Sequence, residues 1–510
     1  MFLAPGLGGN HEKYKKQLSE WERSEYSHPK LSAVLHYVQS GSILSDLADH
    51  GVLTLTPDGK PEKEECLKYL VRWVVLNTGT YDEAWRDREL LDSYIHWYGQ
   101  KLSNGTYGIC GITWRHDMLT DTHAKGILAY AYGAKLISSN DSSEFTYRGR
   151  FCRPEEAATI GYTASQKAHN ALRWLVSTQR VRVGKRTFLW WKLSEGESES
   201  GIDVLLGMAK RNEEDFLNFR KQLRETLSGY RNHTSVDDTV LIASLEAATT
   251  GRLSVPYYSE LGAGDFAERV QRWYDIMTYD SRGHTPTLRQ LAEFAFGNER
   301  TGKMNVDEDV LAATVQRLLQ CVIDCAPLPK DIVFALVHKF SRPLAFVERY
   351  NLNMMQNLAF TAVKSYRNQL FKEEWNLGLD TTCTDRSYLF GRLLAIAEKL
   401  ENDTYGKDDR RTANALRYQF AFSQHPMSTW KTLYEKLTPY KERLRKNRPG
   451  RLSDYEKLIG EISDLIQWDD PNLNTGLSEL YVLGYYHQRQ ALYTKYSGVT
   501  KENDNENEGE

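Results

Sequence analysis

The sequence is poor in cysteine, in long apolar runs and in net charge, and each shortage excludes a class of protein. Six cysteines in 510 residues are too few for a small disulfide-stabilised scaffold. No apolar stretch approaches the ~20 residues of a membrane-spanning helix, and the start, MFLAPGLGGNHEKYKK, is too poor in apolar residues for a signal peptide. We therefore expect a cytoplasmic protein. The formal net charge is only −3, so any site for a polyanion has to be a local basic patch.

Motifs for catalysis are also missing. The sequence holds no phosphate-binding Gly-x-x-x-x-Gly-Lys-Ser/Thr loop, no His-Glu-x-x-His and no Gly-x-Ser-x-Gly nucleophile elbow. One group of histidines and aspartates lies close enough in sequence to suggest a metal site: His116, Asp117, Asp121 and His123. Scattered surface histidines explain that spacing better. Cys321 and Cys325 stand four apart in an apolar run, as two buried thiols of one helix would. We expect no cofactor and no catalytic site.

The sequence does have the material for a large core, since 41% of its residues are hydrophobic and 12% are aromatic. Residues 11–100 show apolar positions three and four apart, for example around KEECLKYLVRWVVL, which predicts helices. Residues 106–150 are rich in β-branched and aromatic residues between Gly, Asn and Asp, which predicts short strands. We expect a helix over 154–178, and RVRVGKRTFLWW (180–191) predicts a hairpin that turns at Gly184-Lys185.

The second half of the chain has a different pattern. TVLIASLEA and RLSVPYY predict two more strands, and from residue 264 the apolar spacing is helical almost to the end. We therefore predict an α+β fold in three parts. These are a mixed N-terminal α/β region with short antiparallel strands over 1–345, a C-terminal α-helical bundle over 346–500, and a disordered acidic tail over 501–510.

Local groups of cations stand out against the balanced total charge. One run holds six basic residues and a single acid, Glu442; the six are Lys441, Arg443, Arg445, Lys446, Arg448 and Arg451. Such a run can follow the phosphates of a nucleic-acid backbone. A solvated helix end, whose cations interact favourably with the C-terminal dipole, explains it equally well.

Two further basic groups lie in the N-terminal half. Lys185 and Arg186 stand at the expected hairpin turn. Arg180 and Arg182 just before them share one face of the strand, because alternate residues of a strand do. Arg148 and Arg150 flank Gly149 beside Tyr147, and such arginines can pair with phosphates while an aromatic ring stacks on a base. Surface carboxylates could bind the same arginines instead.

Longer strings resemble a known family, the large subunit of the type I-C (Dvulg) CRISPR surveillance complex, Cascade. The strings that carry the resemblance occur in the family's order over about residues 105–500: LISSN (136–140), TYRG (146–149), GYT (161–163), ALRWL (171–175), TFLW (187–190), RLSV (252–255), YLFGRLLAIAEKL (388–400), GYYHQRQ (484–490) and LYTK (492–495). The chain departs from the family pattern at Ser139, where members carry Phe, and at Arg148, which interrupts a Ser-Tyr-Gly motif. Its N-terminus also looks short against the family.

The resemblance implies a binding protein rather than an enzyme. Such a subunit binds target double-stranded DNA at the protospacer-adjacent motif, aids formation of the R-loop and helps recruit the helicase-nuclease in antiviral defence. Its implied partners are the backbone subunits that carry the CRISPR RNA, the subunit that caps the guide end, and target DNA. The residues expected to contact DNA near the motif are Asn140, Tyr147, Arg148, Arg150, Lys185 and Arg186, and the 441–451 run is expected to follow the displaced strand. Two alternatives remain: a metal-dependent nuclease or hydrolase using the His116–His123 group, and a purely structural scaffold.

The C-terminal bundle is also a candidate for a separate polypeptide. The family implies that an internal start yields a small subunit, and Met354-Met355 stands just inside the expected bundle. Five apolar residues of the following segment are spaced for a buried helix face: Tyr388, Leu389, Leu393, Leu394 and Ile396. Two methionines that merely fill a core gap are the equally good alternative.

Overall fold

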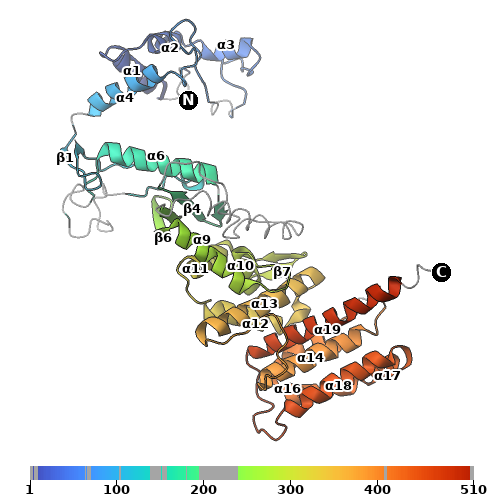
Figure 1. Cartoon of the computed structure of the whole chain (residues 1–510). Helices are drawn as coiled ribbons and strands as arrows, with labels where there is room; N and C mark the ends of the chain where they lie inside the picture. Colours follow the sequence, from blue (N-terminus) through green and yellow to red (C-terminus); the bar gives the residue numbers. More distant parts are fainter. Residues whose placement is uncertain are drawn as a thin grey trace. The chain divides into compact units, whose positions relative to one another are not determined.

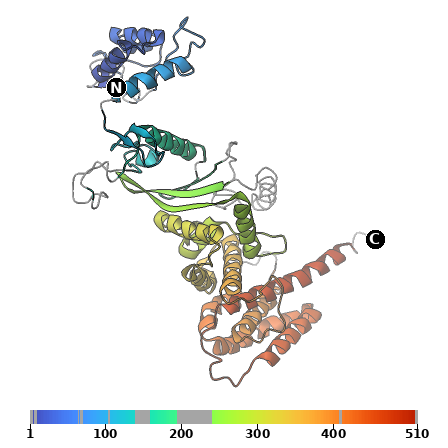
Figure 2. The same cartoon turned by 60° about the vertical axis from the view of Figure 1, so that its left-hand side comes forward.

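The structure is a computed structural model, and it describes residues 4, 10–63, 65, 70–102, 105–137, 151, 158–179, 181–193, 239–406 and 411–505. The chain divides into two compact units. The first comprises Met1–His123 and Ser138–Ala168, and the second comprises Ala124–Ile137 and His169–Glu510. The helices and antiparallel sheets confirm the predicted α+β class (Figures 1 and 2). Among the described residues, no helix is both long and apolar enough to cross a membrane.

The first unit is built from helices and one small hairpin. Its helices are α1 (Asn10–Glu22), α2 (Pro29–Ser40), α3 (Ile43–Asp49) and α4 (Arg88–Leu102), and its hairpin pairs β1 (Tyr107–Ile109) with β2 (His116–Met118). The core of this unit packs Trp21, Trp97 and aliphatic residues of α1 and α2. Trp21 and Trp97 stack with ring centroids 5.9 Å apart.

The helix expected around KEECLKYLVRWVVL is wrong for residues 70–77. That segment is irregular and makes one isolated bridge, between Val74 and Glu83. Trp73 and Val75 pack against the core, whereas Val74 and Leu76 are exposed. This alternation is the burial pattern of an extended chain, and a dense apolar run does not distinguish it from a helix.

The second unit centres on a four-stranded antiparallel sheet in the order β3-β4-β5-β6. Its strands are β3 (Val181–Val183), β4 (Arg186–Lys192), β5 (Thr239–Thr249) and β6 (Arg252–Gly262). The hairpin predicted at Gly184-Lys185 is confirmed, and Gly184 has the positive φ of 56° that such a turn requires. The helix expected from 154 is α6, which begins at Tyr162 and ends at Gln179. No strand forms over 127–137, where the chain makes a short 3-10 turn, Ala129–Ala131.

The two faces of this sheet are covered differently. Leu189 and Leu245 pack with α6 and with Ile127 and Leu128. Phe188 and Trp190, which point to the opposite face, join a large core formed by the helices that follow. Figure 1 shows α6 on one side of the sheet and α9 on the other.

The helices after the sheet continue to the end of the described chain. They are α9 (Ala263–Met277), α10 (Leu288–Phe296), α11 (Glu308–Ile323), α12 (Lys330–Phe340), α13 (Arg349–Leu370), α14 (Arg386–Asn402), α15 (Asn414–Gln424), α16 (Pro426–Lys436), α17 (Thr438–Asn447), α18 (Pro449–Leu465) and α19 (Leu480–Asn505). A hairpin of β7 (Asn298–Arg300) and β8 (Lys303–Asn305), which the sequence did not predict, interrupts them. Cys325 lies beyond the end of α11, so the two cysteines do not share one helix as expected; only Cys321 is buried.

Helix α14 is the centre of the C-terminal helices. Its residues from Ser387 to Glu401 are all buried, including the five predicted to form a buried face. One hydrophobic cluster extends from the sheet through α9–α13 to α14 and α19. This cluster includes residues on both sides of the expected 345/346 boundary, and that boundary stays a prediction about the segment that folds alone.

Candidate nucleic-acid interface

The basic run of the sequence lies where α17 meets α18. Helix α17 ends at Asn447 and α18 begins at Pro449, with Arg448 as the one-residue link. Proline suits the first position of a helix because its missing N–H would have no partner there. Four of the six cations have exposed side chains, and we call them the α17 cation patch: Arg443, Arg445, Lys446 and Arg448.

The other two cations of the run, Lys441 and Arg451, contact residues of the bundle. Lys441 is buried, and its Nζ lies 3.7 Å from the centroid of the Tyr434 ring. Arg451 donates to the Asp403 carboxylate at 3.2 Å, and the same carboxylate oxygen accepts the Tyr455 hydroxyl at 2.6 Å. Through these contacts, Lys441 and Arg451 stabilise the packing of the bundle.

The α17 cation patch has few competing partners. Arg445 pairs with Glu442 one turn earlier, with both side chains more than half exposed, and such a surface pair contributes little stability. Arg443 lies 6.0 Å from the Tyr440 ring centroid. Lys446 and Arg448 make no side-chain ion pair within the described chain. Because exposed, weakly committed cations can release counterions when a phosphate binds, this patch suits a nucleic-acid backbone.

The β3–β4 hairpin offers a smaller basic site than the sequence suggested. Lys185 Nζ lies 2.8 Å from Asp309 Oδ2 in an exposed pair, and the Asp309 carboxylate raises the pKa of Lys185. Arg186 is mostly buried and donates to Glu246 Oε2 at 2.8 Å, an ion pair that joins β4 to β5. Arg182 stacks its guanidinium 3.8 Å from the Tyr130 ring centroid.

The remaining DNA-contact predictions lie outside the described residues. They are Asn140, Tyr147, Arg148 and Arg150. Arg180, expected to share a face with Arg182, also lies outside them.

The first unit carries a surface that the sequence reasoning missed, the turn of the β1–β2 hairpin. Trp114 is 81% exposed and has a φ of 55°, which is rare for a bulky residue. Its neighbour Arg115 is exposed, and Tyr107 stacks on His116 with ring centroids 5.8 Å apart. An exposed aromatic ring beside a cation is the arrangement that stacks on nucleic-acid bases. The sequence gives the residue types but not their exposure.

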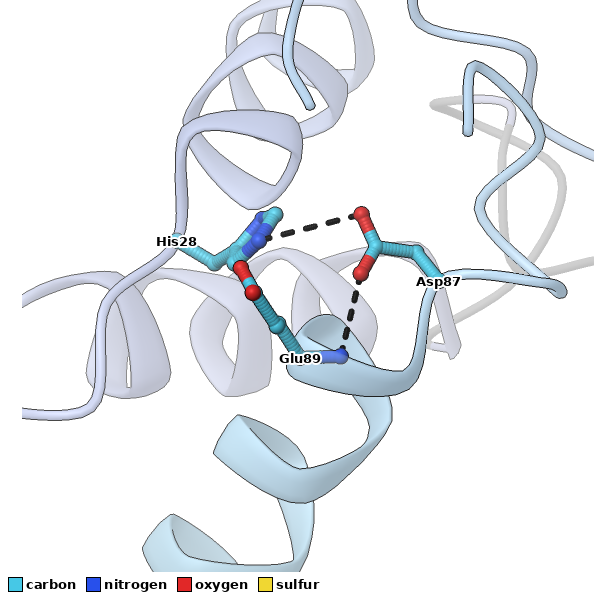
Figure 3. Close-up of side chains that lie close together, drawn as sticks. All are labelled: His28, Asp87 and Glu89. Carbon is cyan, nitrogen blue, oxygen red and sulfur yellow. Dashed lines mark hydrogen bonds and ion pairs between the residues drawn. The ribbon is translucent and has the colours of Figure 1, made fainter. Parts of the chain in front are cut away.

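The four residues of the alternative metal site do not meet as ligands. His116 packs on Tyr107, and His123 is buried with its Nδ1 2.9 Å from Ser165 Oγ. Among the described residues, one group brings three such ligand atoms within 4.8 Å of one another: His28, Asp87 and Glu89 (Figure 3).

That group is organised as an ion-pair cluster. The Asp87 carboxylate is already paired with the fully buried ammonium of Lys30, which lowers the pKa of Asp87. Its other oxygen caps α4 by accepting the Glu89 N–H at 3.0 Å (Figure 3). His28 Nδ1 accepts the Lys30 backbone N–H at 3.2 Å, so Nε2 carries the proton of the neutral ring. The cation position beside Asp87 is therefore filled by lysine, and the residues do not fit a resident metal ion.

Comparison with known proteins supplies the family. No curated protein matches the chain. A protein-family model described as CRISPR-associated protein (Cas_Csd1) matches residues 4–493, which is nearly the whole chain and includes both units. This match confirms the resemblance found in the sequence, and the chain belongs to the Cas_Csd1 family of CRISPR-associated proteins.

Proposed function

We propose that this chain is the non-catalytic large subunit of a type I-C CRISPR RNA-guided surveillance complex. In this role it binds target double-stranded DNA at the protospacer-adjacent motif, aids R-loop formation and takes part in recruiting the helicase-nuclease. The observation that carries the proposal is the family match over residues 4–493. The α17 cation patch and the exposed β1–β2 turn support it, because exposed cations can contact phosphates and an exposed aromatic ring can stack on a base.

The first experiment tests the α17 cation patch in the assembled complex. Affinity for target DNA is measured against salt for the wild type and for R443Q/R445Q/K446Q/R448Q. Each lost phosphate contact on a single strand reduces the salt slope by about 0.7, so loss of four reduces it by up to about 2.8. The matched control, R417Q/K431Q/K436Q/K457Q, removes four exposed cations of α15, α16 and α18. Equal slopes for the two variants would favour the scaffold alternative for this surface.

A second experiment tests the β1–β2 turn. We expect W114A to weaken specific target binding by about 1–3 kcal/mol, the usual contribution of one stacked base, while guide assembly is unchanged. The control is I95A, which removes a similarly exposed apolar side chain from α4 of the same unit. If W114A and I95A bind target DNA equally, the turn is not part of the interface.

The absence of catalysis is part of the proposal and has its own test. The purified chain is incubated with DNA and with RNA in magnesium or manganese, and its bound metal is quantified. We expect no cleavage and no stoichiometric metal. Cleavage that survives in His116→Ala but depends on the chain would place an active site elsewhere and overturn the proposal of a binding subunit.

The partners are proposed on the same basis. They are the backbone subunits that carry the CRISPR RNA and the subunit that caps the guide end. Purification of the complex from its native gene identifies them, together with any small subunit that starts near Met354. A stoichiometric fragment of the C-terminal third supports the internal start, and full-length chain alone contradicts it.

A further inference from the structure

A pocket in the second unit has features of a ligand site that the proposed function does not use. It has a volume of about 750 Å³, within the range of pockets that bind small molecules. It lies between the end of α9, the end of α13 and the segment that follows α13. The two helices pack against each other in the large core of this unit.

The lining of this pocket is strongly cationic. The lining contains three cations, Arg272, Lys364 and Lys372, and one carboxylate, Asp275, so its net charge is +2. Asp275 accepts a hydrogen bond from Gln271 at 2.8 Å. Arg272 and Lys372 are exposed and make no hydrogen bond or ion pair with any side chain that the structure describes. The two cations are therefore available to a ligand.

Lys364 is the most informative of the three cations. Lys364 is only 5% exposed, yet among the described residues its ammonium makes one hydrogen bond, to the Thr278 carbonyl at 2.6 Å. Burial without a carboxylate lowers the pKa of Lys364 to about 8. Burying a charged group without a counter-ion is costly, and an anion in the pocket removes that cost.

Trp375 forms a rigid aromatic part of the wall. Its backbone N–H and carbonyl are both held by the Asn368 amide, at 2.8 and 2.7 Å. Its ring stacks on Tyr388 with centroids 5.2 Å apart. Beside it, the Asn376 carbonyl accepts the His487 Nε2 proton at 3.0 Å, which fixes the neighbouring chain. A wall held in this way needs no rearrangement to receive a planar ring.

We propose that this pocket binds a nucleoside phosphate, with the phosphate on Arg272, Lys364 and Lys372 and the base against Trp375. The charge selects the ligand class. A phosphate monoester carries about −1.5 to −2 at neutral pH, which matches the net +2 of the lining, whereas a backbone diester carries −1. The ligand is a free nucleotide or the phosphorylated end of a strand, which present the same group.

The experiment uses the purified full chain without guide RNA. Equilibrium dialysis with AMP, GMP, CMP, UMP and unphosphorylated adenosine measures binding. We expect at least one monophosphate to bind at least 10-fold more tightly than adenosine. R272Q/K372Q and K364M are expected to weaken that binding at least 10-fold. R300Q/K330Q, which removes two exposed cations outside the pocket, leaves it unchanged. Absence of binding by any monophosphate at millimolar concentration overturns the proposal, as does undiminished binding by R272Q/K372Q.

Two further measurements separate the outcomes. Lys364→Met removes the buried charge, so we expect a higher melting temperature without ligand and no nucleotide-induced shift. A lower melting temperature with an unchanged nucleotide-induced shift contradicts the role of Lys364.

Competition with oligonucleotides identifies the source of the phosphate. If a 5′-phosphorylated oligonucleotide competes and the same oligonucleotide with a 5′-hydroxyl does not, the ligand is a strand end. If neither oligonucleotide competes, the ligand is a free nucleotide. Equal competition by both places binding on the phosphodiester backbone and overturns the proposal. R272Q/K372Q should leave target-DNA affinity of the complex unchanged, so this inference and the proposed function fail independently.

Discussion

The crossing of α14 and α19 makes the strongest stability prediction, because two glycines face the opposite helix there. A Cβ on Gly391 would overlap the Tyr481 carbonyl oxygen and lie 2.8 Å from the Tyr485 nitrogen. A Cβ on Gly484 would overlap the Tyr388 carbonyl and lie 3.0 Å from the Tyr388 Cα. The obstacles are backbone atoms, which no side-chain rotation moves. Gly391→Ala and Gly484→Ala therefore force the two helices apart.

The size of the effect follows from the geometry. Opening the Gly391 Cβ contact with the Tyr485 nitrogen from 2.8 Å to the 3.4 Å at which ordinary contact begins needs a shift of about 0.6 Å. The contact with the Tyr481 carbonyl oxygen is tighter still, so the helices must move further than this, and α14 is buried from Ser387 to Glu401. Overpacking a core costs about 1–3 kcal/mol, and contact with backbone places these variants near 3 kcal/mol. The second unit has about 350 residues. At ~2.1 cal/mol/K per residue its unfolding entropy is about 0.75 kcal/mol/K, so the melting temperature falls by about 4 °C.

Scanning calorimetry measures the melting temperature, and hydrogen exchange in α14 and α19 peptides locates the loosening. The control is Gly460→Ala in α18, where a Cβ meets nothing within 4 Å. There alanine should stabilise by up to about 1 kcal/mol, because glycine is a poor helix former. One helix displacement accommodates both new methyl groups, so the double variant should cost less than the two single costs added. A Gly391→Ala protein as stable as the wild type would refute the reasoning.

Three other contacts give predictions that urea unfolding or proteolysis can check. Asp87→Asn leaves Lys30 buried without its partner and should cost the first unit about 3–5 kcal/mol. Because the folded pKa of Asp87 is lowered, this stabilisation is present above the unfolded pKa of ~3.9 and is lost as the pH falls through the folded value. Burial lowers the pKa of His487 from 6.5 to about 4. The free energy of unfolding of the wild type should therefore fall by about 3 kcal/mol as the pH drops from 6.5 to 4, because the unfolded chain binds the proton first. His487→Asn has no titrating ring and should not show this loss. Arg386 donates to the carbonyls of residues 472, 473, 475 and 476, so Arg386→Ala should speed proteolysis of that loop several-fold, and unchanged cleavage contradicts this role.

Sequence patterns predicted the elements whose signal is local. The β3–β4 hairpin has β-branched or aromatic residues on both sides of Gly184, whose φ of 56° only glycine adopts easily. The β5–β6 hairpin also has apolar and β-branched residues in both of its eleven-residue strands. Residues 70–77 failed because their burial depends on α1, α2 and α4, which are distant in sequence. A short window of apolar residues does not specify which of its side chains will pack into that core.

For the candidate interface, too, the sequence predicts one part of the arrangement and not the other. The basic run of α17 is evident in the sequence, but the direction of each cation is not evident from composition. Helical spacing gives part of the answer, since Lys441 stands three residues before the buried Leu444 and shares its face. Arg445 and Lys446 fall on the other faces and are exposed. Trp114 had no such signal, because its exposure results from the left-handed turn between β1 and β2.

The structure also predicts how a chain that starts at Met354 would behave. The end of α12 is part of the core around α19: the Phe340 ring lies 5.4 Å from Tyr481 and 5.3 Å from Tyr485, edge to face. A start at Met354 removes α12 and exposes both tyrosine rings. Each such pair contributes about 0.5–1.5 kcal/mol beyond the area that it buries, so a fragment from Met354 should be at least about 2 kcal/mol less stable in urea than one from Pro329.

Equal stability of the two fragments would contradict this argument, because it would mean that α12 adds nothing to the bundle. Residues 354–370 of α13 remain in the shorter fragment, so the difference isolates the missing α12 and the first residues of α13. The uncovered face holds Tyr481 and Tyr485, which are almost fully buried in the complete chain. If the small subunit is made from this start, we expect a neighbouring subunit to cover the face that holds Tyr481 and Tyr485. On assembly, these tyrosines should then gain protection from oxidation, and the backbone around them from hydrogen exchange.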